Sequence, residues 1–105
     1  MEQLIRVFIA DASAEFAALL SDALEQEEDF VVVGCVRRGD LALEQLRSCR
    51  ADLLVTDLLL PGLDGLSLLR RLREEELLPH TLVVSGFCND RIARIVSSFA
   101  DNFLP

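Results

Sequence analysis

The stretch VTDLLLPGLDG, at Val55–Gly65, contains the end of an apolar strand, a turn and the start of a helix. The strand is predicted at Asp52–Thr56 (DLLVT), because this short apolar run has the length of a strand. The helix is predicted to begin at Asp64 or Gly65 and to run to about residue 77, where Pro79 stops it. Its apolar side chains, which we expect to face a core, are Leu66, Leu69 and Leu72.

The same alternation of a short apolar run and a longer helical segment continues on both sides of this stretch. Further strands are predicted at Leu4–Ala10 (LIRVFIA), Phe30–Val36 (FVVVGCV) and His80–Val84 (HTLVV), and a last short piece, Asn102–Leu104, would be a fifth strand. The runs are almost continuously apolar, which is typical of parallel strands covered on both faces. Strands and helices that alternate in this way predict βαβ units and therefore an α/β domain.

Three more helices are predicted between these strands. The helix at Ser13–Glu27 has Ser13 as its N-cap. Its apolar stripe consists of Phe16, Leu19, Leu20, Ala23 and Leu24. Asp40 is predicted to cap a second helix, which runs through Cys49 and buries Leu43 and Leu46. Another helix is expected near Asn89–Phe99, because its apolar residues also recur with helical spacing.

The composition limits the classes of protein to which the chain can belong. Its 105 residues, 51% of them hydrophobic, are enough for one domain with its own core. No apolar run approaches the roughly 20 residues that cross a bilayer, and no basic flank precedes the apolar N-terminal stretch, so we expect a cytoplasmic protein without a signal peptide. The net charge of −8 argues against direct binding to nucleic acid, since phosphate contacts need a basic face.

Three predicted strands lead into a polar side chain: Asp11, Asp57 and Ser85. The carboxyl ends of parallel strands share one edge of a sheet, and ligands bind there. Two carboxylates at close range repel one another and favour a cation between them. Magnesium fits, because it prefers oxygen ligands and keeps several waters. With a cation present, Asp57 can act as a nucleophile toward phosphorus, and Ser85 can donate a hydrogen bond to the phosphoryl group.

A simpler interpretation of these aspartates is that they form turns or cap helices. For Asp11 alone the two interpretations are about equally supported. For Asp57 the simpler one is weaker, because Leu58–Leu60 and Pro61 separate it from the next helix. The coincidence of three polar strand ends favours a functional site.

The pattern at Val55–Gly65 resembles the receiver domains of two-component response regulators. That family has a strand, a phosphoacceptor aspartate, three mostly apolar residues, Pro, Gly and an Asp-Gly helix start. The likeness extends from Ile5 to Pro105, and the segment Met1–Leu72 is most similar to the receivers of sporulation master regulators. It implies a flavodoxin-like, doubly wound α/β fold with strand order 2-1-3-4-5. A single receiver domain is expected over residues 1–105, without its final helix and with a DNA-binding output domain outside the chain.

The resemblance assigns roles to individual residues. Asp57 matches the phosphoacceptor, and Ser85 matches the hydroxyl that senses the phosphoryl group. Phe103 matches the aromatic position that switches between inward and outward rotamers. Asp11, Asp57 and the backbone carbonyl of Leu59 match the ligands of Mg²⁺ in the family.

Ala12 departs from the family pattern, because the family has a second metal-binding acid there. A methyl group cannot ligate a metal ion, so we expect weak Mg²⁺ binding. The lysine that the family places immediately after the position of Pro105 is not in the sequence.

The resemblance implies a switch rather than an enzyme. Its phosphoryl group would come from a His-containing kinase or phosphotransferase, and its output would be transcriptional, with DNA bound only by the absent output domain. The alternative is a pseudo-receiver, a phosphorylation-independent dimerisation or interaction module, which Ala12 motivates. Without a final helix, part of the sheet face beside the first helix would be bare, so self-association, for example as a homodimer, is expected. An unrelated enzyme or flavin-binding protein is the poorest interpretation, because G-x-G-x-x-G and P-loop motifs are absent.

Overall fold

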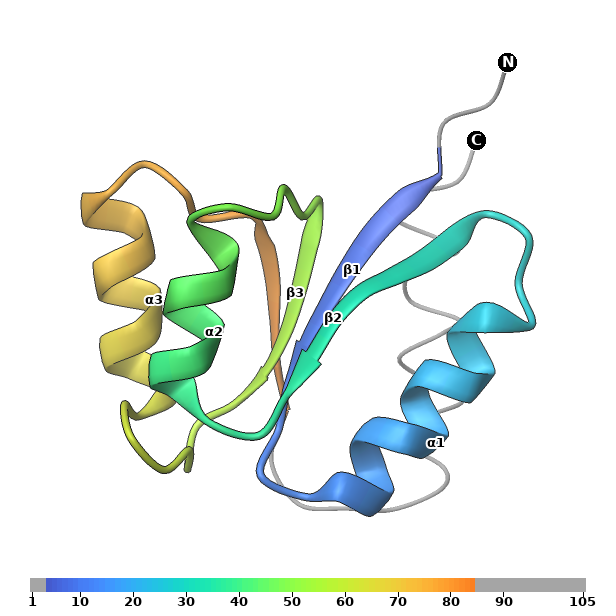
Figure 1. The fold of residues 1–105 in the computed structure, drawn as a ribbon, viewed down its shortest axis with the longest axis horizontal. Helices are drawn as coiled ribbons and strands as arrows, with labels where there is room; N and C mark the ends of the chain where they lie inside the picture. Colours follow the sequence, from blue (N-terminus) through green and yellow to red (C-terminus); the bar gives the residue numbers. More distant parts are fainter. Residues whose placement is uncertain (1–3, 85–105) are drawn as a thin grey trace.

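The computed structural model describes residues 4–84, which form a parallel sheet with helices on both faces (Figure 1). The strand order β2-β1-β3-β4 confirms the flavodoxin-like prediction for the first four strands. The strands are β1 (Ile5–Ala10), β2 (Phe30–Val36), β3 (Leu53–Asp57) and β4 (His80–Val84). The helices are α1 (Ala14–Glu25), α2 (Gly39–Leu46) and α3 (Gly65–Glu74). The predicted helix near Asn89–Phe99 and the predicted strand Asn102–Leu104 lie outside the described residues.

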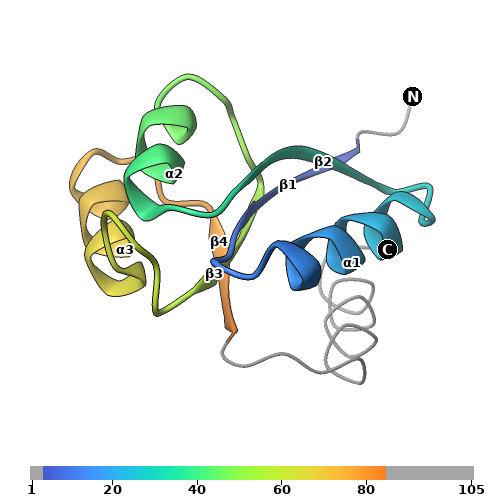
Figure 2. The ribbon, with the colours of Figure 1, turned by 60° about the horizontal axis from the view of Figure 1, so that its bottom comes forward.

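Two separate cores lie on the two faces of the sheet, because successive residues of a strand point to opposite sides. On β1, Val7 and Ile9 belong to the core beneath α1, whereas Phe8 and Ala10 belong to the core beneath α2 and α3. All of these side chains are fully buried. Figure 2 shows α1 on one side of the sheet and the pair α2 and α3 on the other.

Three residues of β3 and β4 are buried on the α1 face of the sheet. Leu53, Val55 and Val84 are at most 2% exposed and belong to the same cluster as Phe16 and Leu20 of α1. The face is therefore not bare at these three positions, whereas Leu82 of β4, which packs against the same cluster, is only partly buried. The expectation that part of this face is bare stays a prediction. Self-association stays a prediction without support from this face.

The N-terminal end of α1 is as predicted, and one residue of its stripe is not. The Phe16 N–H donates to the Ser13 hydroxyl oxygen (3.1 Å), which confirms Ser13 as the N-cap. The buried side chains of the helix are Phe16, Ala17, Leu20 and Leu24. Leu19 is 39% exposed, because the helix turns the side of Ala17 rather than that of Leu19 toward the sheet.

The predicted cap of α2 is wrong. Arg38 occupies the N-cap position without a side-chain hydrogen bond, and Asp40 lies inside the first turn. The Asp40 carboxylate instead accepts from the Arg38 guanidinium (Nε–Oδ1 3.0 Å) and from the Leu41 N–H (3.0 Å). The helix ends at Leu46, short of the predicted Cys49, and buries Leu43 and Leu46 as expected.

Helix α3 begins as predicted but buries different leucines. The Ser67 N–H donates to the Asp64 carboxylate (2.9 Å), so Asp64 is the N-cap. The completely buried leucines are Leu68 and Leu72, whereas Leu66 is 61% exposed. The rotation of the helix is set at its first residue, where the Gly65 N–H donates to the Leu58 carbonyl (2.9 Å).

A Schellman motif ends α3 at Glu74, before the predicted end near residue 77. The Leu77 N–H donates to the Leu72 carbonyl (2.8 Å), and the Glu76 N–H donates to the Arg73 carbonyl (3.1 Å). Glu76 has a φ of 58°, which L-residues with large side chains rarely adopt. Leu77 packs against the same core as Leu72, so tertiary contact rather than Pro79 ends the helix.

Glu76→Gly is expected to raise the free energy of unfolding by about 0.5–1 kcal/mol, because glycine adopts positive φ without steric cost. Urea unfolding of the parent and the variant measures this difference. Glu76→Gln is the control, since it removes the same charge but keeps the steric conflict. Equal gains in both variants would attribute the effect to charge and contradict the conformational explanation.

Candidate functional site

Asp11 and Asp57 come together at the carboxyl edge of the sheet. Strands β1 and β3 are paired in parallel, and Ala10 lies opposite Thr56 in their register. The next residue in the chain after each of these two is an aspartate, so the two carboxylates lie at the same level at the ends of neighbouring strands. The Asp11 N–H donates to the Val36 carbonyl at the end of β2 (3.0 Å), which fixes the backbone of Asp11 at this edge.

Asp11 is a buried acid beside a second acid. It is 5% exposed, and its carboxylate accepts a hydrogen bond from the Ser13 N–H (2.8 Å). Burial raises the pKa of Asp11 above its ordinary value of 3.8, the bond from Ser13 opposes this shift, and the negative charge of Asp57 adds to it. The two acids, hereafter the acid pair, are therefore close enough to repel one another.

In metal-free buffer, Asp11→Asn is expected to raise the free energy of unfolding at pH 7 by on the order of 1 kcal/mol. The pKa of Asp11 is higher in the folded state than in the unfolded state. The folded state therefore binds more protons than the unfolded state at pH values between 3.8 and the raised pKa. The ionised carboxylate thus opposes folding above this window, and the gain from asparagine shrinks as the pH falls toward 3.8.

Urea unfolding as a function of pH checks this prediction. Asp22→Asn, at an exposed aspartate of α1, is the control and should change the free energy of unfolding little throughout this pH range. A loss of stability in Asp11→Asn at pH 7 would contradict the unfavourable burial of the charge.

Asp57 lies at the end of β3, half-buried, where the chain turns away from the sheet. Its carboxylate Oδ1 accepts from the Leu59 N–H (3.3 Å), and no other hydrogen bond to this carboxylate is found within residues 4–84. The buried Thr56 hydroxyl donates to the Asp57 backbone carbonyl (3.0 Å). Leu59 itself is 83% exposed, so the rim of the site beside Asp57 is open to an approaching molecule.

The loop from β3 to α3 is held by backbone contacts that sequence reasoning missed. The Gly39 N–H at the start of α2 donates to the Pro61 carbonyl (3.0 Å), and Gly62 has a φ of 80°. A methyl group on Gly62 would lie 2.4 Å from a carboxylate oxygen of Asp40, so the Arg38–Asp40 pair covers this glycine closely. The hydrogen bond from Arg38 is the main cause that lowers the pKa of Asp40. The glycines at these positions were the available sequence signal.

The structure describes only some of the other candidate site residues. Ser85 and Phe103 lie outside the described residues. Ala12 is exposed beside Asp11. The acid pair suits a divalent cation, since such an ion would relieve the repulsion between the two carboxylates. Over residues 4–84, no group of three or more His, Cys, Asp or Glu side chains gathers as a metal site, so the acid pair supplies few ligands of its own.

The family model for the response regulator receiver domain matches residues 7–105. This chain belongs to the receiver domain family. The match begins within β1, runs to residue 105 and includes both members of the acid pair. The receiver fold and the family resemblance drawn from Val55–Gly65 are thereby confirmed.

Curated relatives of this receiver are larger proteins. It is 34% identical over 104 residues to protein-glutamate methylesterase/protein-glutamine glutaminase 1 of Methanospirillum hungatei, covering 96% of the chain and 30% of the relative. It is 42% identical over 82 residues to the corresponding protein 5 of Myxococcus xanthus, covering 78% of the chain and 24% of the relative. The chain thus spans less than a third of each of these relatives.

Solved receivers have the same fold. The signal receiver domain of NarL from Mycobacterium tuberculosis superposes with a TM-score of 0.76 at 26% identity, covering 91% of this chain and 77% of that one. None of the helices within residues 4–84 is long and apolar enough to cross a membrane.

Proposed function

We propose that this receiver accepts a phosphoryl group on Asp57 from a His-containing kinase or phosphotransferase and thereby works as a signalling switch. The observation that carries the proposal is the acid pair, in which Asp57 ends β3 beside the buried Asp11, which directly follows β1. Membership of the receiver family supports the same role. The open rim at Leu59 leaves a route by which a donor protein can reach Asp57.

The proposed step is a transfer between two side chains. A carboxylate oxygen of Asp57 attacks the phosphorus of a phosphohistidine, and a new P–O bond forms as the P–N bond breaks. The electron pair of that bond returns to the imidazole nitrogen, which takes up a proton from solvent. No redox change occurs. The hydrogen bond from the Leu59 N–H to Oδ1 (3.3 Å) orients the carboxylate for this attack.

Asp11, Asp57 and the backbone carbonyl of Leu59 would hold Mg²⁺. When bound, the ion would offset negative charge on the transferred phosphoryl oxygens. Asp11 contributes by staying ionised near the ion, and its buried position at the end of β1 prevents it from turning away into solvent. Because Ala12 supplies no ligand, we propose that Mg²⁺ binds weakly.

Ser85 and Phe103 are proposed to report the phosphoryl group to the rest of the molecule. Ser85 follows β4 directly in sequence, and β4 is paired with β3 up to Asp57. The hydroxyl of Ser85 would donate to the phosphoryl group, and Phe103 would change rotamer with it. Such a switch shifts a population between two existing conformations.

The output of the switch is also a proposal. The resemblance to sporulation master regulators implies a transcriptional output through a DNA-binding domain outside this chain, with altered dimerisation of the receiver. The curated relatives are methylesterases and glutaminases, so a receiver of this kind can also stand beside a catalytic domain. We propose a non-enzymatic role for the receiver itself in either case.

Ala12→Asp is expected to tighten Mg²⁺ binding about tenfold and to speed phosphorylation. A carboxylate a few ångströms from a divalent cation contributes at least about 1–2 kcal/mol even in water. Isothermal titration measures the binding of Mg²⁺. Intact-mass measurement after incubation with a small acyl phosphate, with and without Mg²⁺, measures phosphorylation. Ala18→Asp, on an exposed position of α1, is the matched control and should leave both unchanged.

The same experiment separates the switch from a pseudo-receiver. A Mg²⁺-dependent single phosphoryl adduct on the parent chain supports the switch. An adduct on Ala12→Asp but none on the parent would identify a pseudo-receiver disabled at one metal ligand. The absence of an adduct on both chains would contradict the proposed function.

A further inference from the structure

The edge of the sheet opposite the acid pair carries a groove with no role in the proposed phosphoryl transfer. It consists of two adjoining hollows, which we call the amino-terminal groove. The first hollow, of about 420 Å³, lies between the α2–β3 and α3–β4 connections. The second, of about 430 Å³, lies at the starts of β1 and β2. Arg50 lines both hollows and joins them into one surface.

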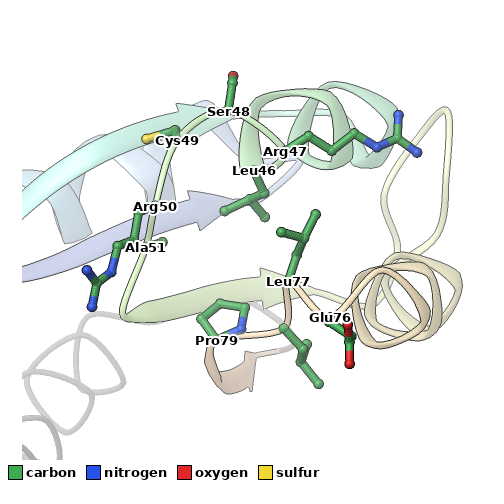
Figure 3. Close-up of a pocket in the computed structure, with 10 residues that line it drawn as sticks. Leu46, Arg47, Ser48, Cys49, Arg50, Ala51, Glu76, Leu77 and Pro79 are labelled. Atoms are coloured by element: carbon green, nitrogen blue, oxygen red, sulfur yellow. The ribbon is translucent and has the colours of Figure 1, made fainter.

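The first hollow is lined partly by apolar and partly by polar residues, and its apolar residues are Leu46, Ala51, Leu77, Leu78 and Pro79. Figure 3 shows Leu46 and Leu77 pointing into the space between the two connections, with Pro79 beside them. Leu78, which also lines this hollow, is 40% exposed. The volume is within the range of about 300–1,000 Å³ that ligand pockets have. The hollow is therefore large enough for one or two large apolar side chains of a partner.

Two arginines, Arg6 and Arg50, line the second hollow. The Arg6 guanidinium is held in place, because its Nε donates to the Arg50 carbonyl (2.7 Å) and its Nη2 lies 4.0 Å from the Cys49 sulfur. Within residues 4–84, neither Arg6 nor Arg50 forms an ion pair, although the chain has a net charge of −8. Arg47, by contrast, extends toward α3 and is paired with Glu75 (2.7 Å) (Figure 3).

The acidic residues that line the groove decide where in it a carboxylate can bind. Asp52 lines the second hollow together with Arg6 and Arg50, and its carboxylate accepts from the Arg6 backbone N–H (2.9 Å). The two guanidinium groups outnumber this one carboxylate, so the charged residues that line the second hollow have a net positive charge. Glu76 lies on the side of the first hollow away from Arg50 (Figure 3). A bound carboxylate is thus favoured beside Arg6 and Arg50 and disfavoured beside Glu76.

We propose that the amino-terminal groove binds a peptide segment of a partner protein in which carboxylate side chains stand next to a large apolar side chain. The carboxylates pair with Arg6 and Arg50, and the apolar side chain fills the hollow between Leu46 and Leu77. The acidic loop of a second copy, Glu25–Asp29, fits less well. It offers charge, but the adjacent Phe30 is 5% exposed and has its own place in the core.

The groove and the acid pair can be occupied together, because they lie at opposite ends of the same strands. Arg6 is near the start of β1, and Asp11 follows its end. Asp52 directly precedes β3, and Asp57 ends it. A partner in the groove therefore leaves the carboxyl edge free for a phosphodonor.

Fluorescence anisotropy with a labelled Asp-Asp-Phe-Leu peptide, titrated with the full chain, tests the proposal. Arg50→Glu is expected to weaken binding about tenfold or more, since it replaces attraction by repulsion. Arg70→Glu makes the same charge change at an exposed position of α3 outside the groove and should leave the affinity within about twofold. Leu78→Asp should also weaken binding, because it places a charge in the apolar hollow. Urea unfolding of each variant shows that it is folded.

Tighter binding of this peptide than of Lys-Lys-Phe-Leu or Asp-Asp-Ala-Ala, with the expected difference between Arg50→Glu and Arg70→Glu, supports the proposal. Equal affinity for the three peptides, or equal losses in the two arginine variants, would overturn it. Sedimentation of the chain alone is the third measurement. A dimer that Arg50→Glu dissociates would replace the partner peptide by a second copy and also overturn the proposal.

Discussion

Asp57→Asn is expected to abolish phosphoryl uptake, with a loss of at least about a thousandfold in rate. An amide is nearly isosteric with a carboxylate and can still accept from the Leu59 N–H, which lies 3.3 Å from Oδ1. It carries no negative charge and is a poor nucleophile toward phosphorus. The variant therefore removes the chemistry and keeps the local structure. Intact-mass measurement after incubation with an acyl phosphate and Mg²⁺ gives the result directly.

Asp64→Asn is the matched control for this prediction. Asp64 lies on the same loop and caps α3 by accepting from the Ser67 N–H (2.9 Å). Asparagine is about as good an N-cap as aspartate, so stability and phosphorylation should both be retained. A phosphoryl adduct that persists in Asp57→Asn and disappears in Asp64→Asn would identify Asp64 as the phosphoacceptor and contradict the assignment of Asp57.

Gly65→Ala is expected to lower the free energy of unfolding by about 2–3 kcal/mol, as overpacking of a tight contact does. A methyl group there would lie 2.3 Å from the Asp57 carbonyl oxygen and 2.8 Å from the Leu58 Cα. Both are backbone atoms, so the contact cannot be relieved by turning a side chain. The end of β3 would have to move, and phosphoryl uptake at Asp57 should slow as well.

The expected loss of stability in Gly65→Ala is opposite in sign to the usual effect of this substitution in a helix. Replacing glycine by alanine in a helix normally stabilises it by up to about 1 kcal/mol. A gain in stability for Gly65→Ala, measured by urea unfolding, would thus show that the contact with β3 is unimportant. Ala14→Gly is the reverse change at the first residue of α1, an exposed position, and should cost no more than about 1 kcal/mol.

Most of the sheet could be predicted from local patterns. Every described strand begins and ends within one residue of its predicted bounds. Continuous apolar runs are a strong signal, because a strand buried on both faces has no polar side to obscure it. Asp11 and Asp57 come directly after two of these runs, so they lie close together because β1 and β3 are neighbours in the sheet.

The helices show where local patterns are insufficient. Leu19 and Leu66 have helical spacing with other leucines, yet they are 39% and 61% exposed. Apolar spacing gives the period of a helix but leaves its rotation uncertain by one residue when leucines are abundant. An aspartate such as Asp40 is a common N-cap and is predicted as one from the sequence, but its pairing with Arg38 and its contact with Gly62 depend on the folded loop.

The sequence by itself determined the α/β class, the strand bounds and the two acids at the strand ends, because these depend on residues close together in the chain. Only the tertiary structure decided which helix faces are buried and how Gly65 meets the end of β3. It also brought Arg6 and Arg50 together at the amino-terminal groove, although they are separated by 44 positions. Such contacts depend on how strands and helices pack across the whole domain, and no local periodicity encodes that packing.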